Sequence, residues 1–345
     1  MNQKVNDKST RKCTESQYAI TGDNKTMLNE KARTTPTDGI EMPSIAGLRC
    51  RGFRGEADYP AMAAVIAQSK EADKQDFTET ADDLRRQYQH LVNSDPFADM
   101  LFVEIGGEVV GYSRIWWQQV VDGPRVYSHF ANLVPAWREQ GIRRAMVRHN
   151  EARIREIAAA HGATVPRVYE CWASDGEKDW MRVLKGEGYE VVRYGFAMVR
   201  PSLDSIPELP LPEGIEVRPA RPEHYDRIWD AARQAFRDHW GFSEEEWAHT
   251  YFESWQQDDT FQPHLWQVAW DGDEVAGMIL NFIHEAENRE YHRLRGYTET
   301  ICVRRPWRRR GLARALIARS LAVLKAEGMT EAALGVDADN PNGAL

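Results

Sequence analysis

Apolar and polar residues alternate along the chain in short stretches that are typical of β-strands, and longer stretches show helical spacing. A helix is expected over 315–327, where apolar residues recur every three or four positions. Each predicted strand is bounded by glycine, proline or polar residues. The predicted strands cover 48–53, 100–105, 109–117, 127–134, 167–172, 215–220, 265–270, 274–282, 298–303 and 332–336.

Two pairs of these strands are predicted to form β-hairpins. Gly106-Gly107 separates one pair and Asp271-Gly272-Asp273 the other, and both are turn sequences. The order strand, helices, hairpin, strand, helix, strand occurs twice. We therefore expect an α+β fold in which each domain is a mostly antiparallel mixed sheet flanked by helices.

The order of elements is matched by residues repeated at an interval of about 167. An interval this long indicates two domains of one fold, because solenoid repeats are much shorter. Three pairs of segments match in the same order: 51–56 with 218–223, 110–112 with 276–278, and 134–141 with 303–311.

Proline marks the boundary between the copies. The stretch 201–213 contains four prolines and is predicted to be an extended linker. The two domains are then expected at 46–200 and 214–345. Residues 1–45 are rich in Lys, Thr, Asn, Asp and Ser, and we expect a disordered tail.

Composition excludes several classes of protein. The net charge of −9 argues against a nucleic-acid partner, and no run of about 18 apolar residues predicts a membrane span. Four scattered cysteines suit reduced thiols in a cytoplasmic protein and form no metal-site spacing. We expect a cytoplasmic monomer or dimer that holds no metal.

Positive charge is concentrated at one place in this acidic chain. Six arginines fall within 304–314, around Gly311 and Ala313, between a predicted strand and a predicted helix. Free N–H groups at a helix start bind anions, and cations there otherwise oppose the helix dipole. A polyphosphate site is the favoured reading. Surface arginines at a solvated helix start and a nucleic-acid patch remain the alternatives.

Arg308-x-x-Gly311-x-Ala313, placed after a strand and opening a helix, resembles the acyl-CoA pyrophosphate loop of the GCN5-related N-acetyltransferase (GNAT) superfamily. The stretch 336–341 resembles that family's fifth strand and the asparagine after it. The tandem arrangement is similar to the mycothiol synthase branch. No motif in the chain specifies that substrate.

The resemblance implies acetyl-CoA as co-substrate and transfer of its acetyl group to a primary amine of a small molecule by direct attack on the thioester. A protein N-acetyltransferase and a non-catalytic acyl-CoA sensor or scaffold are the alternatives. The implied cofactor-binding residues are Cys302, Val303, Arg308, Arg309, Arg310, Gly311, Leu312, Ala313, Arg314 and Asn340. The backbone N–H groups of Cys302 and Val303 are expected to polarise the thioester carbonyl.

Glu299 is the candidate general base, since it lies on the strand that precedes the loop. The alternative is a strand residue that faces solvent. The first copy has Phe130 at the matching place, and its neighbour His129 is expected to be packed. Cys302 is predicted to be a buried strand cysteine rather than a nucleophile.

The first copy of the loop departs from the family pattern. Arg143 stands where the family has glycine or alanine, and Glu139 adds a carboxylate to a site for an anion. We therefore expect a degenerate donor site in the first domain, with a mainly structural or substrate-shaping role.

The family continues beyond its fifth strand with a helix that carries a tyrosine, the usual general acid, and with two more strands. This sequence stops at Leu345, and Val183 stands where the first copy would have its tyrosine. We expect a truncated second domain with an open sheet edge, and no general acid in the sequence.

The segment 235–242 is expected to line the acceptor groove, because its aromatic and charged residues suit a polar amine. A helix end that buries its tryptophan is the equal alternative. Glu244, Glu245, Glu246, Asp258 and Asp259 would attract a cationic acceptor or form a solvated face.

Overall fold

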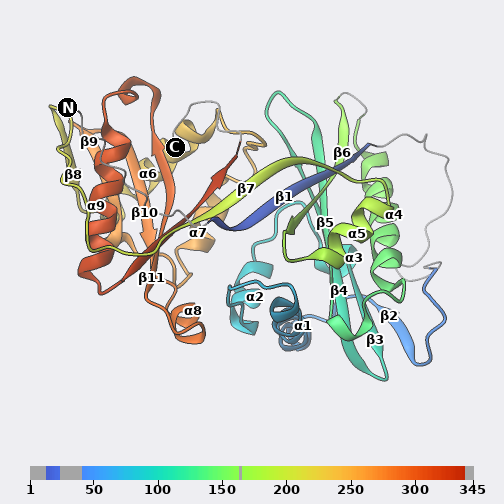
Figure 1. Cartoon of the computed structure of the whole chain (residues 1–345). Coiled ribbons are helices and arrows are strands. Elements are labelled where there is room, and N and C mark those ends of the chain that lie inside the picture. Colours follow the sequence, from blue (N-terminus) through green and yellow to red (C-terminus); the bar gives the residue numbers. More distant parts are fainter. Residues whose placement is uncertain (1–12, 24–40, 163–164, 339–345) are drawn as a thin grey trace, which may run out of the picture.

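The structure is a computed structural model that describes residues 13–23, 41–162 and 165–338, with side chains from residue 41 onward. Two lobes lie side by side, joined by strands that cross between them (Figure 1). In the part of the chain that the structure describes, no helix is both long and apolar enough to cross a bilayer.

The first domain runs from the second strand to the seventh. Its strands confirm the hairpin, strand, helix, strand order predicted from the alternating pattern. The elements are β2 (Leu48–Arg51), α1 (Tyr59–Ala72), α2 (Ala81–Tyr88), α3 (Pro96–Asp99), β3 (Met100–Ile105), β4 (Glu108–Gln119), β5 (Arg125–Leu133), α4 (Ile142–Ala160), β6 (Arg167–Ser174), α5 (Lys178–Gly186) and β7 (Glu190–Arg200).

The second domain repeats the plan. It contains β8 (Ile215–Arg218), α6 (Tyr225–Phe236), α7 (His249–Trp255), β9 (Gln267–Asp271), β10 (Glu274–Phe282), α8 (Glu285–Glu290), β11 (Arg295–Val303), α9 (Leu312–Ala326) and β12 (Glu331–Asp337). The proline-rich stretch between the domains contains no helix or strand. Leu203 in that stretch is buried against Leu321, Leu324 and Ala332, so the connection packs on the second domain.

The strands of both domains form one sheet, in the order β2-β3-β4-β5-β6-β1-β7-β12-β11-β10-β9-β8. The junction is an antiparallel pair between β7 and β12, from Ala332 opposite Arg200 to Asp337 opposite Gly195. The open edge expected at the last strand of the second domain is therefore wrong, because β7 supplies its hydrogen-bonding partner.

The disordered tail predicted for residues 1–45 is also wrong in part. Residues Cys13–Asp23 form β1, which lies between β6 and β7 and pairs antiparallel with both. A strand with a partner on each side satisfies its backbone groups regardless of its side-chain pattern, and this stretch has few apolar residues. The rest of the predicted tail before residue 41 lies outside the described residues.

Among the described strands two neighbouring pairs are parallel, and both open soon after they begin. β5 pairs with β6 from Arg125 to Ser128, and β11 pairs with β12 from Arg295 to Tyr297. Beyond these residues each pair has no further backbone register, so the strands diverge toward the start of the helix that follows. Each domain therefore has one gap in its sheet, bordered by a loop and a helix N-terminus.

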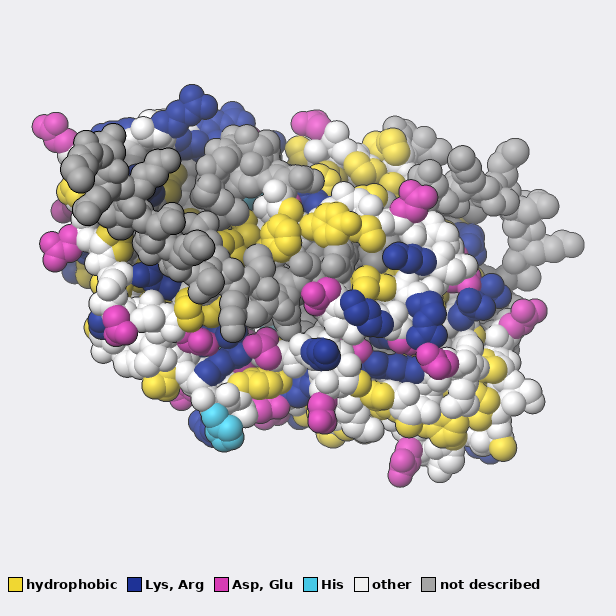
Figure 2. Space-filling model, viewed as in Figure 1, with side chains coloured by type: hydrophobic (Ala, Val, Ile, Leu, Met, Phe, Trp, Pro, Cys, Tyr) yellow, Lys and Arg dark blue, Asp and Glu magenta, His cyan; other side chains and the backbone are white. Residues whose placement is uncertain are grey.

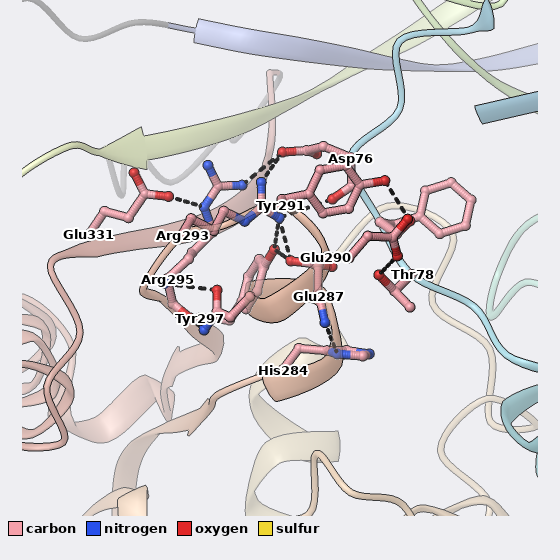
Figure 3. A network of polar contacts seen from close by, with 12 residues as sticks. Asp76, Thr78, His284, Glu287, Glu290, Tyr291, Arg293, Arg295, Tyr297 and Glu331 are labelled. Atoms are coloured by element: carbon pink, nitrogen blue, oxygen red, sulfur yellow. Dashed lines mark hydrogen bonds and ion pairs between the residues drawn. The ribbon is translucent and has the colours of Figure 1, made fainter. Parts of the chain in front are cut away.

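The two domains also meet through side chains around α8, which approaches the chain between α1 and α2 (Figures 1 and 3). Arg293 and Arg295 both bind the Asp76 carboxylate, and Arg293 also binds Glu287. Lys70 and Glu290 form an ion pair at 2.5 Å. Arg293 is largely buried, and its carboxylate partners raise its pKa despite the cost of desolvation.

Asp76→Asn should loosen this contact, because it leaves two largely buried arginines without one of their carboxylates. We expect a loss of about 1–2 kcal/mol in unfolding free energy and faster hydrogen exchange in α8. Asp82→Asn is the control, because Asp82 is exposed and pairs with Arg85 inside the first domain. Equal effects of the two variants would contradict a role for Asp76 in joining the domains.

Candidate functional site

The loop between β11 and α9 ends in a glycine with left-handed backbone geometry. Gly311 has φ 84° and ψ 0° and is the N-cap of α9. Side chains rarely adopt this φ, and a Cβ built on Gly311 would meet no atom within 4 Å. The start of a 15-residue helix is thus open above the glycine, with no side-chain cap among the described residues. Its first N–H groups are placed for an anion.

Four of the six arginines around this loop are already engaged by the protein. Arg305 and Arg308 both bind Asp238, which lies just after α6, and together they hold the pKa of that carboxyl below its usual range. Arg304 pairs with Glu274 at 2.8 Å. Arg310 donates to the Glu213 carbonyl oxygen at 3.0 Å.

Arg309 and Arg314 are different, because both are exposed and neither has a polar partner among the described residues. Figure 2 shows Lys and Arg side chains gathered along the top of the left-hand lobe, on the side where β11 leads into α9 in Figure 1. These two arginines are the ones whose charge remains available to a phosphate.

The contacts of Arg308 have a counterpart in the first domain, where Arg138 makes similar ones. Its Nε donates to the Val303 carbonyl oxygen at 2.8 Å, and its Nη2 donates to the Ala235 carbonyl oxygen. In the first domain Arg138 donates to the Leu133 carbonyl oxygen at 3.2 Å and forms two 2.7 Å bonds to Asp73. The arginine that opens the family motif therefore fastens the loop to the end of the first α-helix of each domain, α1 and α6.

The strands that precede the two loops differ. On β11, Cys302 lies opposite Met278 and Glu299 lies opposite Leu280, so two residues, Thr300 and Ile301, face the single residue Ile279. Thr300 has φ 50°. This is a β-bulge, which bends the strand and leaves one residue out of the ladder. β5 pairs with β4 without any register shift from Leu133 to Arg125.

Glu299 lies beside the bulge, at the gap between β11 and β12. Its Oε1 accepts a hydrogen bond from the Gly335 N–H at 3.1 Å, across the gap. Burial raises the pKa of the Glu299 carboxyl to about 7, although the Gly335 N–H opposes the rise. A carboxyl with this pKa exchanges protons near neutral pH, as a general base does.

The buried side chain of Arg143 lies at the corresponding gap in the first domain. Only 4% of Arg143 is exposed, and its Nε donates to the Ala131 carbonyl oxygen at 2.7 Å. Its guanidinium lies 3.3 Å from Asp179 and over the Trp180 ring. The side chain thus runs from the first turn of α4 to β5 and α5. Gly141 has the same φ of 84° as Gly311. The two loops therefore share this backbone conformation and differ in the side chain two residues later, Arg143 in one and Ala313 in the other.

A cleft of about 750 Å³ lies between the domains and reaches the bulge at Thr300. The first domain contributes α2, the segment after it and β4, while the second contributes α6, α7 and the segment before α7. Val121 N–H donates to the Phe242 carbonyl oxygen at 2.9 Å and so holds that segment in place. The lining includes Arg86, Arg114, Trp116, Trp229, Glu245, Glu246, Trp247, Tyr251, Trp255, Asp258 and Thr300.

The other predicted site residues fall around the loop and the strand. Cys302 is buried and faces Met278, and burial raises the pKa of its thiol to about 12, which does not suit a nucleophile. Leu312 is buried in the core, so only its backbone faces the helix start. Asn340 lies outside the described residues. The predicted packing of His129 is confirmed, since its Nε2 lies 2.7 Å from the Tyr189 hydroxyl.

Sequence reasoning missed the bulge at Thr300 and the first-domain wall of the cleft. One signal was present. The offset between the copies grows from 166 residues at Gly111 and Gly277 to 170 at Gly141 and Gly311. The bulge accounts for one of those added residues, but the sequence does not show where it falls.

Known proteins resemble the chain over most of its length. A family model described as the acetyltransferase (GNAT) family matches residues 228–343. A mycothiol acetyltransferase of Streptomyces bingchenggensis is 31% identical over 254 residues, which are 70% of this chain and 73% of that protein. One from Geodermatophilus obscurus is 26% identical over 247 residues, covering 70% and 74% of the two chains.

Solved structures share the fold. A GCN5-related N-acetyltransferase from Sphaerobacter thermophilus aligns with a TM-score of 0.65 and 26% identity, over 86% of this chain and 89% of that one. A tandem GNAT protein from the clavulanic acid biosynthesis pathway aligns with a TM-score of 0.57 and 16% identity, over 85% and 91% of the two chains. The chain belongs to the GNAT family and is an acyl-CoA-dependent N-acetyltransferase with two domains of that fold in tandem.

Proposed function

We propose that the chain transfers the acetyl group of acetyl-CoA to a primary amine of a small molecule, and that the second domain alone holds the donor. The observation that carries this proposal is the difference between the two gaps. In the second domain the strand bulges at Thr300 and the gap contains Glu299. In the first domain the strand is regular and Arg143 occupies the gap.

In the proposed donor site, backbone N–H groups bind the pyrophosphate and arginine side chains add positive charge beside it. The N–H groups at the start of α9 meet the pyrophosphate, and Gly311 allows it to approach the backbone closely. Arg309 and Arg314 are the exposed cations beside it, while Arg308 holds the loop to Asp238. Ala313 occupies the position at which Arg143 turns into the gap of the first domain.

The reaction needs a neutral amine and donors for the oxyanion. The amine nitrogen attacks the thioester carbon, the carbon–sulfur bond breaks, and the sulfur leaves with the electron pair. We propose that the N–H groups of Thr300 and Ile301 at the bulge stabilise the oxyanion, two positions earlier than the Cys302 and Val303 donors expected from sequence. Glu299 takes the proton of the amine, directly or through water.

The acceptor enters through the cleft between the domains. Its volume of about 750 Å³ suits a small molecule. Walls from both domains line it, and this arrangement favours a small molecule over a long polypeptide. Related proteins are named mycothiol acetyltransferase. For this chain we propose only the broader class, a small-molecule primary amine.

Gly311→Val and Gly141→Val test which domain holds the donor. Both glycines have φ 84°, so both variants carry a similar backbone strain of about 1–2 kcal/mol. Gly311→Val should weaken acetyl-CoA binding by at least about tenfold, because its side chain meets the phosphates. Gly141→Val should bind as the wild type does. Calorimetric dissociation constants measure both, and equal losses would contradict the asymmetry.

Glu299→Gln tests the base. Wild-type kcat/KM should fall as the pH drops through about 7, because the carboxyl becomes protonated and can no longer accept a proton. The variant should be slower by about 10²–10⁴-fold above pH 7 and should lose this limb of the pH profile. If the fall in kcat/KM below pH 7 persists in the variant, a group other than Glu299 causes it.

The raised pKa of Glu299 also predicts how the free energy of unfolding changes with pH, and this can be tested without measuring turnover. Its pKa is near 4.5 when unfolded and about 7 when folded, so the folded state binds the proton more tightly. Wild-type stability should therefore fall as the pH rises from 4.5 to 7, by up to about 3 kcal/mol. Glu299→Gln should remove that fall. Denaturant unfolding at pH 5 and pH 8 measures it, and parallel changes in both proteins would refute the burial of Glu299.

A further inference from the structure

Arg114 on β4 is a cation that lines the cleft without a hydrogen-bonded carboxylate among the described residues. It makes no hydrogen bond or ion pair with any described residue, and its Nε is both buried and without an acceptor. Its guanidinium lies 4.9 Å from the ring centre of Tyr88 and 5.2 Å from that of Trp116. Glu79 interacts with it electrostatically, but the Glu79 carboxylate accepts a hydrogen bond from Gln87 at 2.6 Å.

Aromatic rings hold this guanidinium in place, and the residue lines both the cleft and a smaller cavity beside Glu79. Stacking of an arginine on rings fixes its plane without using its N–H donors. A largely buried arginine normally has a carboxylate or carbonyl partner, since desolvating an unpaired charge is costly. Arg138 and Arg143 in the same domain follow that rule. Arg114 does not, which indicates that its partner arrives from outside.

The sister domain shows that the fold does not require an arginine here. Gly277 lies opposite Val303 and Gly111 opposite Leu133, so the two hairpins superpose with an offset of 166 residues. The counterpart of Arg114 is then Leu280, which is 2% exposed and lies in the apolar core of the second domain. The cation belongs to the first domain alone.

Charge is divided between the two walls of the cleft. Arg86 lies with Arg114 on the first-domain wall, and its Nε is likewise buried without an acceptor. Arg86 does pair with Asp83 at 2.5 Å and lies 3.9 Å from Asp258. On the second-domain wall are Glu245, Glu246 and Asp258, together with Thr300 at the bulge. A molecule with opposite charges at its two ends would match both walls.

We propose that the acceptor is an amine that also carries an oxyanion, a carboxylate or a phosphate, and that Arg114 binds this oxyanion. The first domain then supplies substrate recognition while the second supplies the donor. The inference rests on the proposed acetyl transfer for its catalytic consequence, but not for the binding itself. The oxyanion fills the unmet hydrogen-bonding capacity of Arg114, and the amine points toward Thr300 and Glu299.

The test compares amines that differ only in the anion: β-alanine with its carboxamide, and phosphoethanolamine with ethanolamine. Wild-type protein should use at least one anionic amine with kcat/KM about 10–100-fold above that of its neutral partner. Arg114→Leu should abolish the preference mainly through KM, and Arg114→Lys should restore part of it. The pair that shows the preference distinguishes carboxylate from phosphate.

Leu280 shows that leucine is compatible with this sheet position, and Arg319→Leu on the exposed side of α9 controls for the loss of one positive charge. Arg319→Leu should keep the wild-type preference. Equal use of charged and neutral amines by the wild type, or a preference that survives in Arg114→Leu, would overturn the proposal.

Binding without acetyl-CoA separates this inference from the proposed function. The cleft is lined by Trp116, Trp229, Trp247 and Trp255, so bound amine should change tryptophan fluorescence. Binding of β-alanine or phosphoethanolamine that is lost in Arg114→Leu supports the inference even if no acetyl group is transferred. Transfer to these amines without any dependence on Arg114 supports the proposed function and rejects the inference.

Discussion

Divergence of two parallel strands is the constraint on which the site depends. Backbone pairing between β11 and β12 ends after Tyr297, and every feature of the proposed donor site depends on the gap that opens there. The Glu299 side chain spans the gap to the Gly335 N–H, the bulge at Thr300 bends one of its borders, and the left-handed Gly311 lies at its end. A sheet paired along its full length would have no room for these groups, because adjacent strands lie about 4.8 Å apart.

The first domain is an internal comparison, since it has the same gap with different contents. Its loop has the same left-handed glycine and the same arginine–aspartate tie, Arg138 with Asp73. What differs is the residue two positions after the glycine. Arg143 turns into the gap and bonds to Ala131, where the second domain has Ala313. The backbone plan has therefore been kept in both copies, and the two gaps differ in the side chain at this position, which is long in the first domain and short in the second.

The first domain forms one wall of the cleft between the domains. This role gives a physical reason for its presence even though Arg143 lies at its own gap. Its β7 covers the edge of β12, its hairpin end holds Phe242, and its α1–α2 segment binds α8 through Asp76. These contacts fix the wall that carries Arg114 relative to the bulge. Pre-organised walls of this kind reduce the entropic cost of orienting an acceptor.

Strands, hairpins, the duplication and the small-residue loop were predictable, because each depends on local patterning or on short motifs. The continuous sheet was not, since backbone pairing of β7 with β12 and of β1 with its neighbours leaves little trace in side-chain type. Which arginines are paired and which are exposed was also not predictable from the sequence. Arg308 and Arg309 are adjacent in sequence, yet one is fixed by Asp238 and the other is exposed, because φ at Arg309 is positive and the chain reverses there.

The asymmetry between the domains can be measured as the number of CoA molecules bound per chain, from calorimetric titration of the intact protein with a crystal structure of the complex. This asymmetry predicts one molecule, with its pyrophosphate at the start of α9 and its pantetheine arm in the gap between β11 and β12. Two molecules per chain, or one seated at Gly141 with Arg143 displaced from the gap, would contradict it.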